Sequence, residues 1–298
     1  ICDPHEITNV LGEEGFEWFL RSSELMEQNL FVQASSCVPA LPGFETNGSE
    51  FPLSSLIKYR EHPSVLGLAE MMNFPGVIHG NDEVLDKIEA FSELNLDGHS
   101  PLLQGKALNA YLLAGIQNCH ETVTKEEGKE KLQKGMSLII REGSVAKNLK
   151  TLIPLVNEFN SPQCFLCTDD RNPFEIKHEG HVNFMLHEMI NKHQVPMHVA
   201  YRLSSFSAAK HFGLKRLGLI APGKWADIVL LSDAKKVEIK DVLSKGKFVR
   251  DLKLGDHVAT KLQASQPPMK NTIHRKPIEL SELKYDLVKS DYRCIEII

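Results

Sequence analysis

Short apolar runs alternate with amphipathic stretches between about residues 29 and 170, and this alternation is typical of βα units that build a parallel sheet. Most of the apolar runs end at a polar or charged residue, as strands do where they reach the edge of a sheet. The pattern predicts strands at 30–32, 65–69, 94–98, 116–119, 136–140 and 164–168.

Helix signals lie in the stretches between these strands. Thr124 and Glu127 have the spacing of a capping box, and Gly115 and Gly135 stand where helices would end. The α/β pattern therefore extends through the first half of the chain. Further helical segments are predicted at 149–156, at about 180–193 and at 197–212.

The pattern changes after residue 213. Residues 218–227 are rich in turn formers, and 228–231 followed by 237–249 are typical of short antiparallel strands. Beyond residue 251 the periodicity weakens, and Gln-Pro-Pro at 266–268 indicates a linker. We therefore expect domain boundaries near residues 213 and 251.

Composition narrows the class of protein. The chain has 298 residues, 42% of them hydrophobic, which is enough to bury a large core and excludes disorder as the default. It has no run of about 18 apolar residues, so a membrane-spanning helix is not expected. With 34 basic and 39 acidic side chains, the net charge of -5 argues against a nucleic-acid partner.

The cysteines and the first residues bear on compartment and completeness. Six cysteines without an apolar leader indicate free thiols in a reducing compartment, so we predict a cytoplasmic protein. Because the chain opens on Ile1 rather than on methionine, we expect it to be a piece of a longer protein.

Candidate chemistry gathers at the ends of the predicted strands, where Glu70, His99, His120, Arg141 and Asp169 follow one another at the spacing of βα units. In a parallel barrel the carboxyl ends of all strands converge on one face, so these side chains would meet. Two imidazoles and two carboxylates suit a divalent ion such as zinc, manganese or iron. A carboxylate can bridge two ions, and another can take a proton from bound water.

Less specific interpretations exist for several of these residues. One histidine or glutamate alone at a strand end is more often a solvated loop residue. Cys164 and Cys167 could indicate a redox or zinc motif, but residues three apart on a strand face opposite sides, so we predict core thiols. Three histidines after the final strand are interpreted mainly as surface residues, with one in a supporting or substrate role as the alternative: His178, His181 and His187.

Taken in chain order, several motifs resemble the signatures of the bacterial-type adenine deaminase family of the amidohydrolase superfamily. The resemblance runs from Ile1 to about Asp251 and includes the turn-rich segment 218–231. The motifs are Asp-Pro-His-Glu-Ile at 3–7, Ser-Ser-Cys-Val-Pro-Ala at 35–40, Gly-Leu-Ala-Glu-Met-Met at 67–72, Asp-Gly-His-Ser-Pro at 97–101, His-Glu at 120–121, Ile-Arg-Glu-Gly-Ser at 140–144 and Cys-Thr-Asp-Asp-Arg at 167–171.

This resemblance implies an α/β fold with a TIM-like (β/α)₈ barrel and a small β domain. It also implies hydrolysis of adenine to hypoxanthine and ammonia in purine salvage, by a homo-oligomer with a binuclear metal centre, for which manganese is favoured over iron or zinc. The implied domains are a partial metal-dependent barrel at 1–213, a return to the small β domain at 214–251 and the start of a truncated C-terminal region at 252–298.

The resemblance also assigns roles. Glu70 matches the metal-bridging carboxylate, and His99 and His120 match imidazole ligands. Asp169 matches an aspartate that binds metal and moves protons, and Glu121 is a second catalytic candidate that moves protons or hydrogen-bonds the purine. Glu142 shares the alternatives of Glu121. The residues expected to bind substrate are Ser36, Arg141, Glu142 and Asp170.

One departure from the family pattern matters. The first barrel strand of the family carries a His-x-His pair, and this chain has none, so we expect the pair upstream of Ile1. The segment alone is therefore predicted to be inactive and poorly folded, because its barrel would be open. Two other interpretations stay open, namely another amidohydrolase acting on a cyclic amide or N-acyl substrate, and a non-catalytic scaffold with the same fold.

Overall fold

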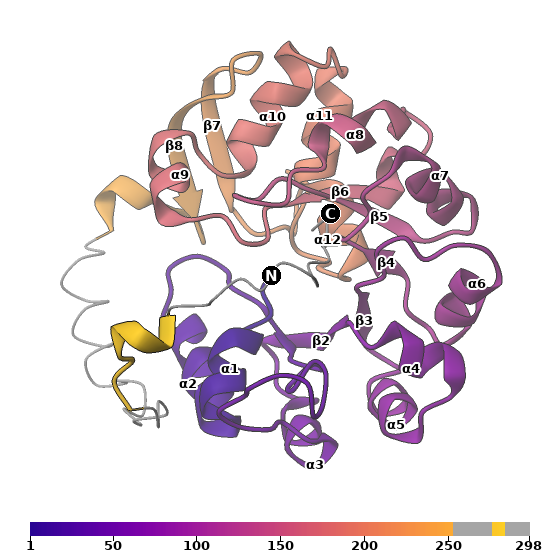
Figure 1. Ribbon diagram of the computed structural model, residues 1–298. Helices are drawn as coiled ribbons and strands as arrows, with labels where there is room; N and C mark the ends of the chain where they lie inside the picture. The colour runs from indigo at the N-terminus through magenta and orange to yellow at the C-terminus, as the bar shows by residue number, and fades with distance from the viewer. Residues whose placement is uncertain (253–275, 284–298) are drawn as a thin grey trace. The chain divides into compact units, whose positions relative to one another are not determined.

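The computed structural model describes residues 1–252 and 276–283 (Figure 1). The chain divides into two compact units, Ile1–Pro268 and Met269–Ile298. In the described part of the second unit there is a short 3-10 helix, η5 (Leu280–Leu283). Most of the expected C-terminal region 252–298 lies outside the described residues, and the boundaries near 213 and 251 stay predictions.

Parallel strands follow one another in chain order across the first unit. Its two three-stranded sheets have the orders β1-β2-β3 and β4-β5-β6, and every pairing in them is parallel. The α/β fold is therefore confirmed, as a partial barrel over the described residues. The strands are β1 (Val32–Ala34), β2 (Val65–Met71), β3 (Asn95–Gly98), β4 (Asn118–Cys119), β5 (Ser137–Arg141) and β6 (Cys164–Cys167).

Further contacts link the two sheets and extend the first sheet beyond β1. Gly98 N donates to Asn118 Oδ1 at 3.0 Å, which links β3 to β4. A Cβ atom on Gly98 would lie 2.1 Å from the Asn118 carbonyl oxygen, so only glycine permits this approach. On the other side of the row, Cys2 forms a parallel bridge to Val32. The strand ends are thereby held on one continuous edge.

The helices that precede or connect these strands lie outside the row (Figure 1). Thr124 and Glu127 form the predicted capping box, and Gly115 and Gly135 follow helices with φ of 98° and 87°. The elements are α1 (His5–Leu11), α2 (Glu13–Glu24), α3 (Leu53–Leu56), η1 (Ile57–Tyr59), α4 (Phe74–His79), α5 (Asp82–Ala90), α6 (Gly105–Leu113), α7 (Lys125–Gln133), α8 (Leu149–Leu152), η2 (Ile153–Leu155) and η3 (Ser161–Gln163).

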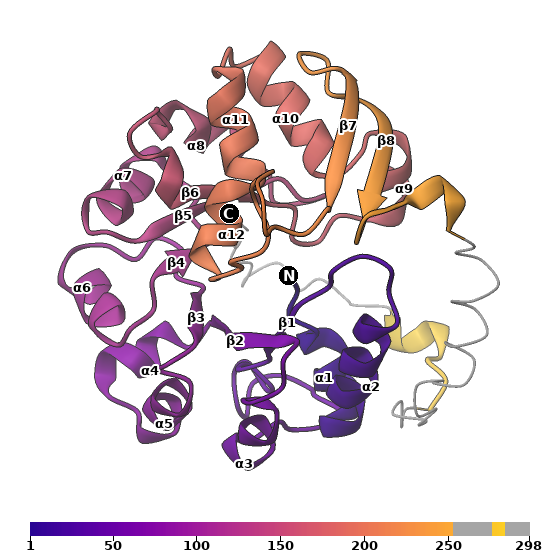
Figure 2. The same cartoon turned by 180° about the vertical axis from the view of Figure 1, so that it is seen from behind.

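Among the described residues, four α-helices follow β6: α9 (Pro173–His178), α10 (Val182–Asn191), α11 (Met197–Ser204) and α12 (Phe206–His211). The single helix predicted over 197–212 is wrong, because Ser205 leaves helical geometry at φ -137° and ψ -77°. The Ser205 hydroxyl donates to the Tyr201 carbonyl at 2.6 Å, and such a side-chain bond competes with the helical ladder. The break lets α12 lie against β6, where the rings of His211 and Phe165 are 4.9 Å apart (Figure 2).

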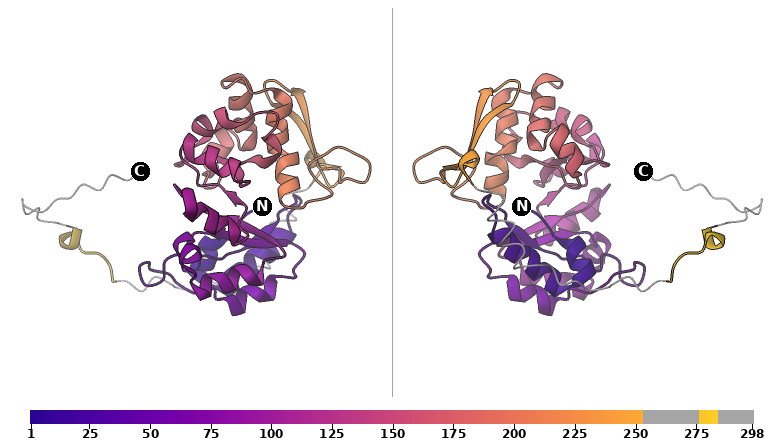
Figure 3. Two further views of the ribbon diagram at one scale, coloured as in Figure 1. Left: turned by 90° about the vertical axis from the view of Figure 1, so that its right-hand side faces the viewer. Right: turned by 90° about the vertical axis from the view of Figure 1, so that its left-hand side faces the viewer.

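An antiparallel sheet closes the described part of the first unit, as the sequence predicts. It contains β7 (Ile228–Asp233), β8 (Glu238–Ser244) and β9 (Lys247–Phe248), followed by η4 (Val249–Asp251). Within the predicted stretch 237–249, β8 and β9 are separated by Lys245 and Gly246, which turn with φ of 50° and 80°. Tyr201 OH donates to the Ala234 carbonyl at 2.7 Å, which holds the β7–β8 hairpin beside the helices (Figure 3).

Two further expectations concern the cysteine thiols and membrane-spanning helices. Cys164 and Cys167 lie in different apolar clusters on the two sides of β6, so the prediction of core thiols is confirmed. Burial raises the pKa of the Cys164 thiol to about 12. The described cysteines are free, and Cys294 lies outside the described residues. No helix in 1–252 or 276–283 is long and apolar enough to cross a membrane.

Candidate metal centre

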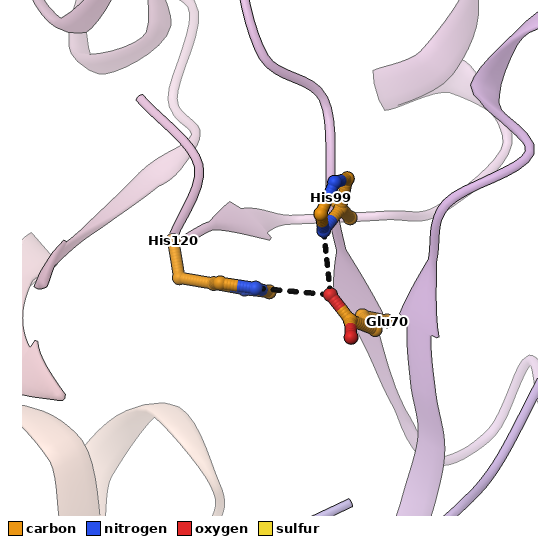
Figure 4. Close-up of side chains that lie close together, drawn as sticks. All are labelled: Glu70, His99 and His120. Atoms are coloured by element: carbon orange, nitrogen blue, oxygen red, sulfur yellow. Dashed lines mark hydrogen bonds and ion pairs between the residues drawn. The ribbon is translucent and has the colours of Figure 1, made fainter. Parts of the chain in front are cut away.

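Three of the four predicted metal ligands are in direct contact. Glu70, the next-to-last residue of β2, points at His99 after β3 and His120 after β4 (Figure 4). Glu70 Oε2 lies 2.6 Å from His99 Nδ1 and 2.9 Å from His120 Nε2. The two imidazole rings are 5.4 Å apart and nearly perpendicular, so both can direct a nitrogen at one point beside the carboxylate. The strand ends therefore converge as expected.

Electrostatics couple these three side chains. Burial alone would raise the pKa of Glu70, but hydrogen bonds from His120 and His99 outweigh it and hold that pKa far below its usual range. Burial opposes a charged His120, yet the Glu70 carboxylate raises the pKa of His120 to about 9. A metal ligand must be an unprotonated imidazole nitrogen, so a cation would take the place of these protons.

The donor set fits a divalent cation. Glu70, His99 and His120 offer ligand atoms that all lie within 4.8 Å of one another. Nitrogen and carboxylate oxygen suit zinc, manganese and iron alike, so this donor set does not select one ion. The three side chains are largely buried, which would shield a bound ion from solvent.

Asp169 reaches the same region from β6 but is held by Arg141. Arg141 Nη1 lies 2.6 Å from Asp169 Oδ2, and Nη2 lies 2.8 Å from Glu121 Oε2, with a further contact from Nη1 to Glu121 Oε1. His120, Glu121 and Asp169 form a second group of ligand atoms within 4.8 Å. His120 is thus common to both groups. Asp169 has φ of 51°, a left-handed conformation that aspartate tolerates better than most residues.

Sequence reasoning missed Asp3 and His5. His5 Nδ1 lies 3.0 Å from Asp3 Oδ2 and 3.3 Å from Glu70 Oε1, so a third group of ligand atoms adjoins the first at Glu70. Ser35 Oγ donates to Asp3 Oδ1 at 2.5 Å. Hydrogen bonds that the protonated His5 donates to Asp3 and Glu6 raise the pKa of His5 to about 11 against the effect of burial. The Asp-Pro-His-Glu run at 3–6 was the available signal.

A buried polar network beneath His99 was also missed. Asp97 accepts from Gln33 Nε2 at 2.5 Å and from Asn118 Nδ2, and burial raises the pKa of Asp97 to about 7. Asn118 Nδ2 also lies 2.8 Å from His211 Nε2. Asp97 belongs to the Asp-Gly-His motif, so its place next to a ligand was a usable signal. The network joins β1, β3, β4 and α12 directly below the strand ends.

The four predicted substrate-binding residues have different surroundings. Arg141 pairs with Glu121 and Asp169 as described above. Ser36 Oγ donates to the Glu70 backbone carbonyl at 2.7 Å, and the charge of Asp169 raises the pKa of Asp170, which is exposed. The Glu142 carboxylate accepts from Leu149 N at 3.1 Å, at the start of α8. Their roles toward a substrate stay predictions.

Three histidines after β6 were interpreted mainly as surface residues. His178, His181 and His187 are all exposed, in agreement with that interpretation. His181 Nε2 lies 2.7 Å from Thr168 Oγ1, immediately before Asp169, and burial lowers the pKa of His181. It is therefore the one that contacts the end of β6.

Comparison with known proteins matches residues 1–249 to the amidohydrolase family. Proteins named adenine deaminase from Bdellovibrio bacteriovorus, Edwardsiella ictaluri and Escherichia coli O1:K1 / APEC are 72%, 59% and 56% identical to this chain. Each alignment covers 100% of the chain and 51% of the relative, so the chain spans about half the length of these curated relatives.

Likeness to solved structures is weak. A structure described as molinate hydrolase aligns with a TM-score of 0.42 at 14% identity, over 83% of this chain and 57% of that one. Such a score adds nothing to the assignment, which depends on the family match alone. Because that match extends over nearly all of the described first unit, the chain belongs to the amidohydrolase family.

Proposed function

We propose that the full-length protein containing this chain is a metal-dependent adenine deaminase that hydrolyses adenine to hypoxanthine and ammonia. The observation that carries the proposal is the convergence of Glu70, His99 and His120, with Asp169 beside His120. Relatives that are 56% to 72% identical over the whole chain and bear that name support the choice of substrate.

Glu70, His99, His120 and Asp169 would hold the metal. We favour manganese, with iron and zinc as alternatives, in a binuclear centre that Glu70 would help to hold as the bridging carboxylate. When bound, the metal supplies Lewis acidity that makes water a stronger acid and a better nucleophile. The full-length protein would add a His-x-His pair on a further strand, completing a (β/α)₈ barrel beside the small β domain.

Proton transfer falls to Asp169 in this proposal. Water adds across the C6–N1 bond of adenine, so its oxygen binds C6 and one of its protons goes to N1. The C6–N6 bond then breaks and ammonia leaves, so the second water proton must move to N6. Asp169 accepts the proton and delivers it to the leaving nitrogen. Glu121 is the second candidate for this work, and Arg141 fixes both carboxylates through its two ion pairs.

The remaining predicted residues act around that step. Asp170 and Glu142 are the candidates to hydrogen-bond the purine. Ser36 acts through the backbone of Glu70, whose carbonyl it holds. Arg141 contributes to substrate binding mainly by orienting Glu121 and Asp169. We further propose a cytoplasmic homo-oligomer whose partner is the small-molecule substrate, not a nucleic acid or a membrane.

The test is a comparison of Glu70→Gln with Glu61→Gln in the full-length protein. Glu61 is an exposed surface carboxylate, with 90% of its side-chain surface accessible, and serves as the matched control. After reconstitution with manganese, we expect Glu70→Gln to lose metal and to cut kcat by orders of magnitude, because an amide is a poorer bridging ligand. The control should match the wild-type protein in metal content, by mass spectrometry, and in hypoxanthine formation.

Three outcomes contradict the proposal. Full metal content and turnover in Glu70→Gln would show that Glu70 is not a ligand. Hydrolysis of cyclic amides or N-acyl compounds in place of adenine would favour another amidohydrolase reaction. Failure of the wild-type protein to bind metal or to turn over any of these substrates would favour a scaffold.

A further inference from the structure

Lys131 on α7 carries a charge in the interior that the proposed reaction does not use. Its side chain is fully buried, as is that of its ion-pair partner Glu127. Lys131 Nζ lies 2.6 Å from Glu127 Oε1 and donates to the Ser100 carbonyl at 2.7 Å. It also contacts Thr122 Oγ1 at 3.2 Å and Cys119 Sγ at 3.3 Å.

These contacts lie beside two candidate metal ligands. Ser100 directly follows His99, and Cys119 directly precedes His120, so one ammonium group binds both histidine-bearing segments. Cys119 Sγ strengthens the link, because it also accepts from Ser100 N at 3.4 Å. The relative position of the two imidazoles therefore depends on a side chain from α7.

Glu127 extends the same connection to the following loops. Its Oε1 accepts from Leu102 N at 2.9 Å, in the loop after His99. Its Oε2 accepts from Val123 N at 3.0 Å and from Thr124 N at 3.4 Å, in the loop after His120. The capping box of α7 thus serves both to start the helix and to hold the two loops together.

Tyr111 on α6 forms the corresponding link between Glu70 and His99. It is fully buried, and its hydroxyl donates to the Met71 carbonyl at 2.8 Å and accepts from His99 N at 3.0 Å. Met71 directly follows Glu70 in β2. With Lys131, this hydroxyl connects the backbones of all three converging residues in the order β2, β3, β4.

We propose that Lys131 with Glu127, and Tyr111, are positioning residues that set the separation of Glu70, His99 and His120 for a divalent cation. The inference rests on the proposed metal site. A fully buried ion pair is a weak source of stability, since apolar side chains of similar volume often do as well or better. A satisfied polar network does impose one geometry on the groups that it joins. The contacts of this network end on residues next to the ligands in sequence, so we assign the network the role of positioning those ligands.

The same helix offers a matched control. Lys134 and Glu130 form an ion pair with the same i, i+4 spacing and the same 2.6 Å separation. Lys134 Nζ donates to the Gly105 carbonyl at 2.7 Å, and Glu130 Oε1 accepts from Gly105 N at 2.8 Å. This second pair therefore also joins α7 to a preceding loop, but at the start of α6 and away from both histidines.

The experiment compares three variants of the full-length protein: Lys131→Met with Glu127→Gln, Tyr111→Phe, and Lys134→Met with Glu130→Gln. The double changes remove both charges of a pair, so neither leaves an unpaired buried charge. After removal of metal, each protein is titrated with cobalt, and its affinity and visible absorption spectrum are recorded. The melting temperature of the metal-free protein is measured in parallel.

We expect the first two variants to bind cobalt about 10- to 100-fold more weakly and with a shifted spectrum, as changes in groups that orient metal ligands usually do. The Lys134 and Glu130 variant should keep the wild-type affinity and spectrum. The absorption spectrum reports ligand geometry in the folded protein. If the residues had a purely structural role, the substitutions would lower the melting temperature and leave the spectrum unchanged. If the Lys131 and Glu127 variant does not fold, Tyr111→Phe, which removes one oxygen atom, decides the question.

Wild-type affinity and spectrum in Tyr111→Phe and in a folded Lys131 and Glu127 variant would overturn the inference. A fourth protein, His99→Asn, separates this failure from failure of the proposed function. If His99→Asn loses cobalt binding while the positioning variants keep it, only the positioning role is wrong. If His99→Asn binds cobalt as well as the wild-type protein, the metal site itself is misplaced.

Discussion

Arg141 is the structural link between the two candidate proton-transfer carboxylates, and its replacement gives a quantitative prediction. Its guanidinium contacts both oxygens of Glu121 and one oxygen of Asp169. Its side chain is 7% exposed, against 15% for Glu121 and 34% for Asp169. Arg141→Met keeps much of the apolar stem but leaves two carboxylates close to each other without a cation.

The expected cost follows from that burial. Removing one partner of a buried ion pair costs about 3 to 5 kcal/mol, mainly because the other charge stays buried and unpaired. Asp169 is partly exposed, so solvent screens its share and the lower end of the range applies. We therefore expect Arg141→Met to lower the free energy of unfolding by about 3 kcal/mol. Adding Glu121→Gln should restore part of the loss, because it removes the more buried unpaired charge.

The assay is urea unfolding of the full-length protein in the presence of a chelator, so that metal binding does not contribute. Wild type, Arg141→Met, Glu121→Gln and the double variant form a double-mutant cycle, whose interaction energy should fall at about 1 to 3 kcal/mol. Additive single effects, or a loss below about 0.5 kcal/mol in Arg141→Met, would refute the reasoning, since surface substitutions alone give changes of that size.

Two further predictions concern single residues. Asp169→Asn should abolish adenine turnover in the full-length protein, because an amide cannot accept the proton. Asp170→Asn should act mainly on KM. If only Asp170→Asn were inactive, the roles of the two residues would be reversed. Burial lowers the pKa of His211 from 6.5 to about 4. The stability that depends on a neutral His211 is therefore fully present above pH 6.5 and is lost as the pH falls through 4. His211→Gln should therefore lose less thermal stability than wild type between pH 7 and pH 5, and equal losses would contradict the assignment.

The sequence was most informative where chemistry and periodicity coincide. A run of alternating apolar segments located the parallel strands, and the first polar residue after a strand located His99 and His120. The rule works because the carboxyl ends of parallel strands share one edge. It failed for Asp3 and His5, because the backbone beside them pairs with β1 only through the Cys2 bridge and gives no apolar run.

Side-chain competition was the other source of error. Nothing in the 3.6-residue periodicity of 197–212 marks Ser205 as a break, since serine is tolerated in helices. The break depends on the hydrogen bond from the Ser205 hydroxyl to the Tyr201 carbonyl and on the contacts between α12 and β6. In the same way, no spacing rule could say that Arg141 would engage Glu121 and Asp169. Such choices are set by distances across the assembled fold.

The candidate site depends on the assembled fold, because other helices and strands hold the backbones of its ligands. Ser36 and Cys37, after β1, both donate to the Glu70 carbonyl, at 2.7 and 2.9 Å. Tyr111 and Lys131 hold the segments around His99 and His120 from α6 and α7. The ligand set therefore exists only when β1 to β4 and both helices are in place.

A cation bound there would favour the folded state alone, adding about 2.7 kcal/mol of stability at a free concentration of 100 Kd. Metal affinity and folding stability are thus linked through the same few backbone contacts.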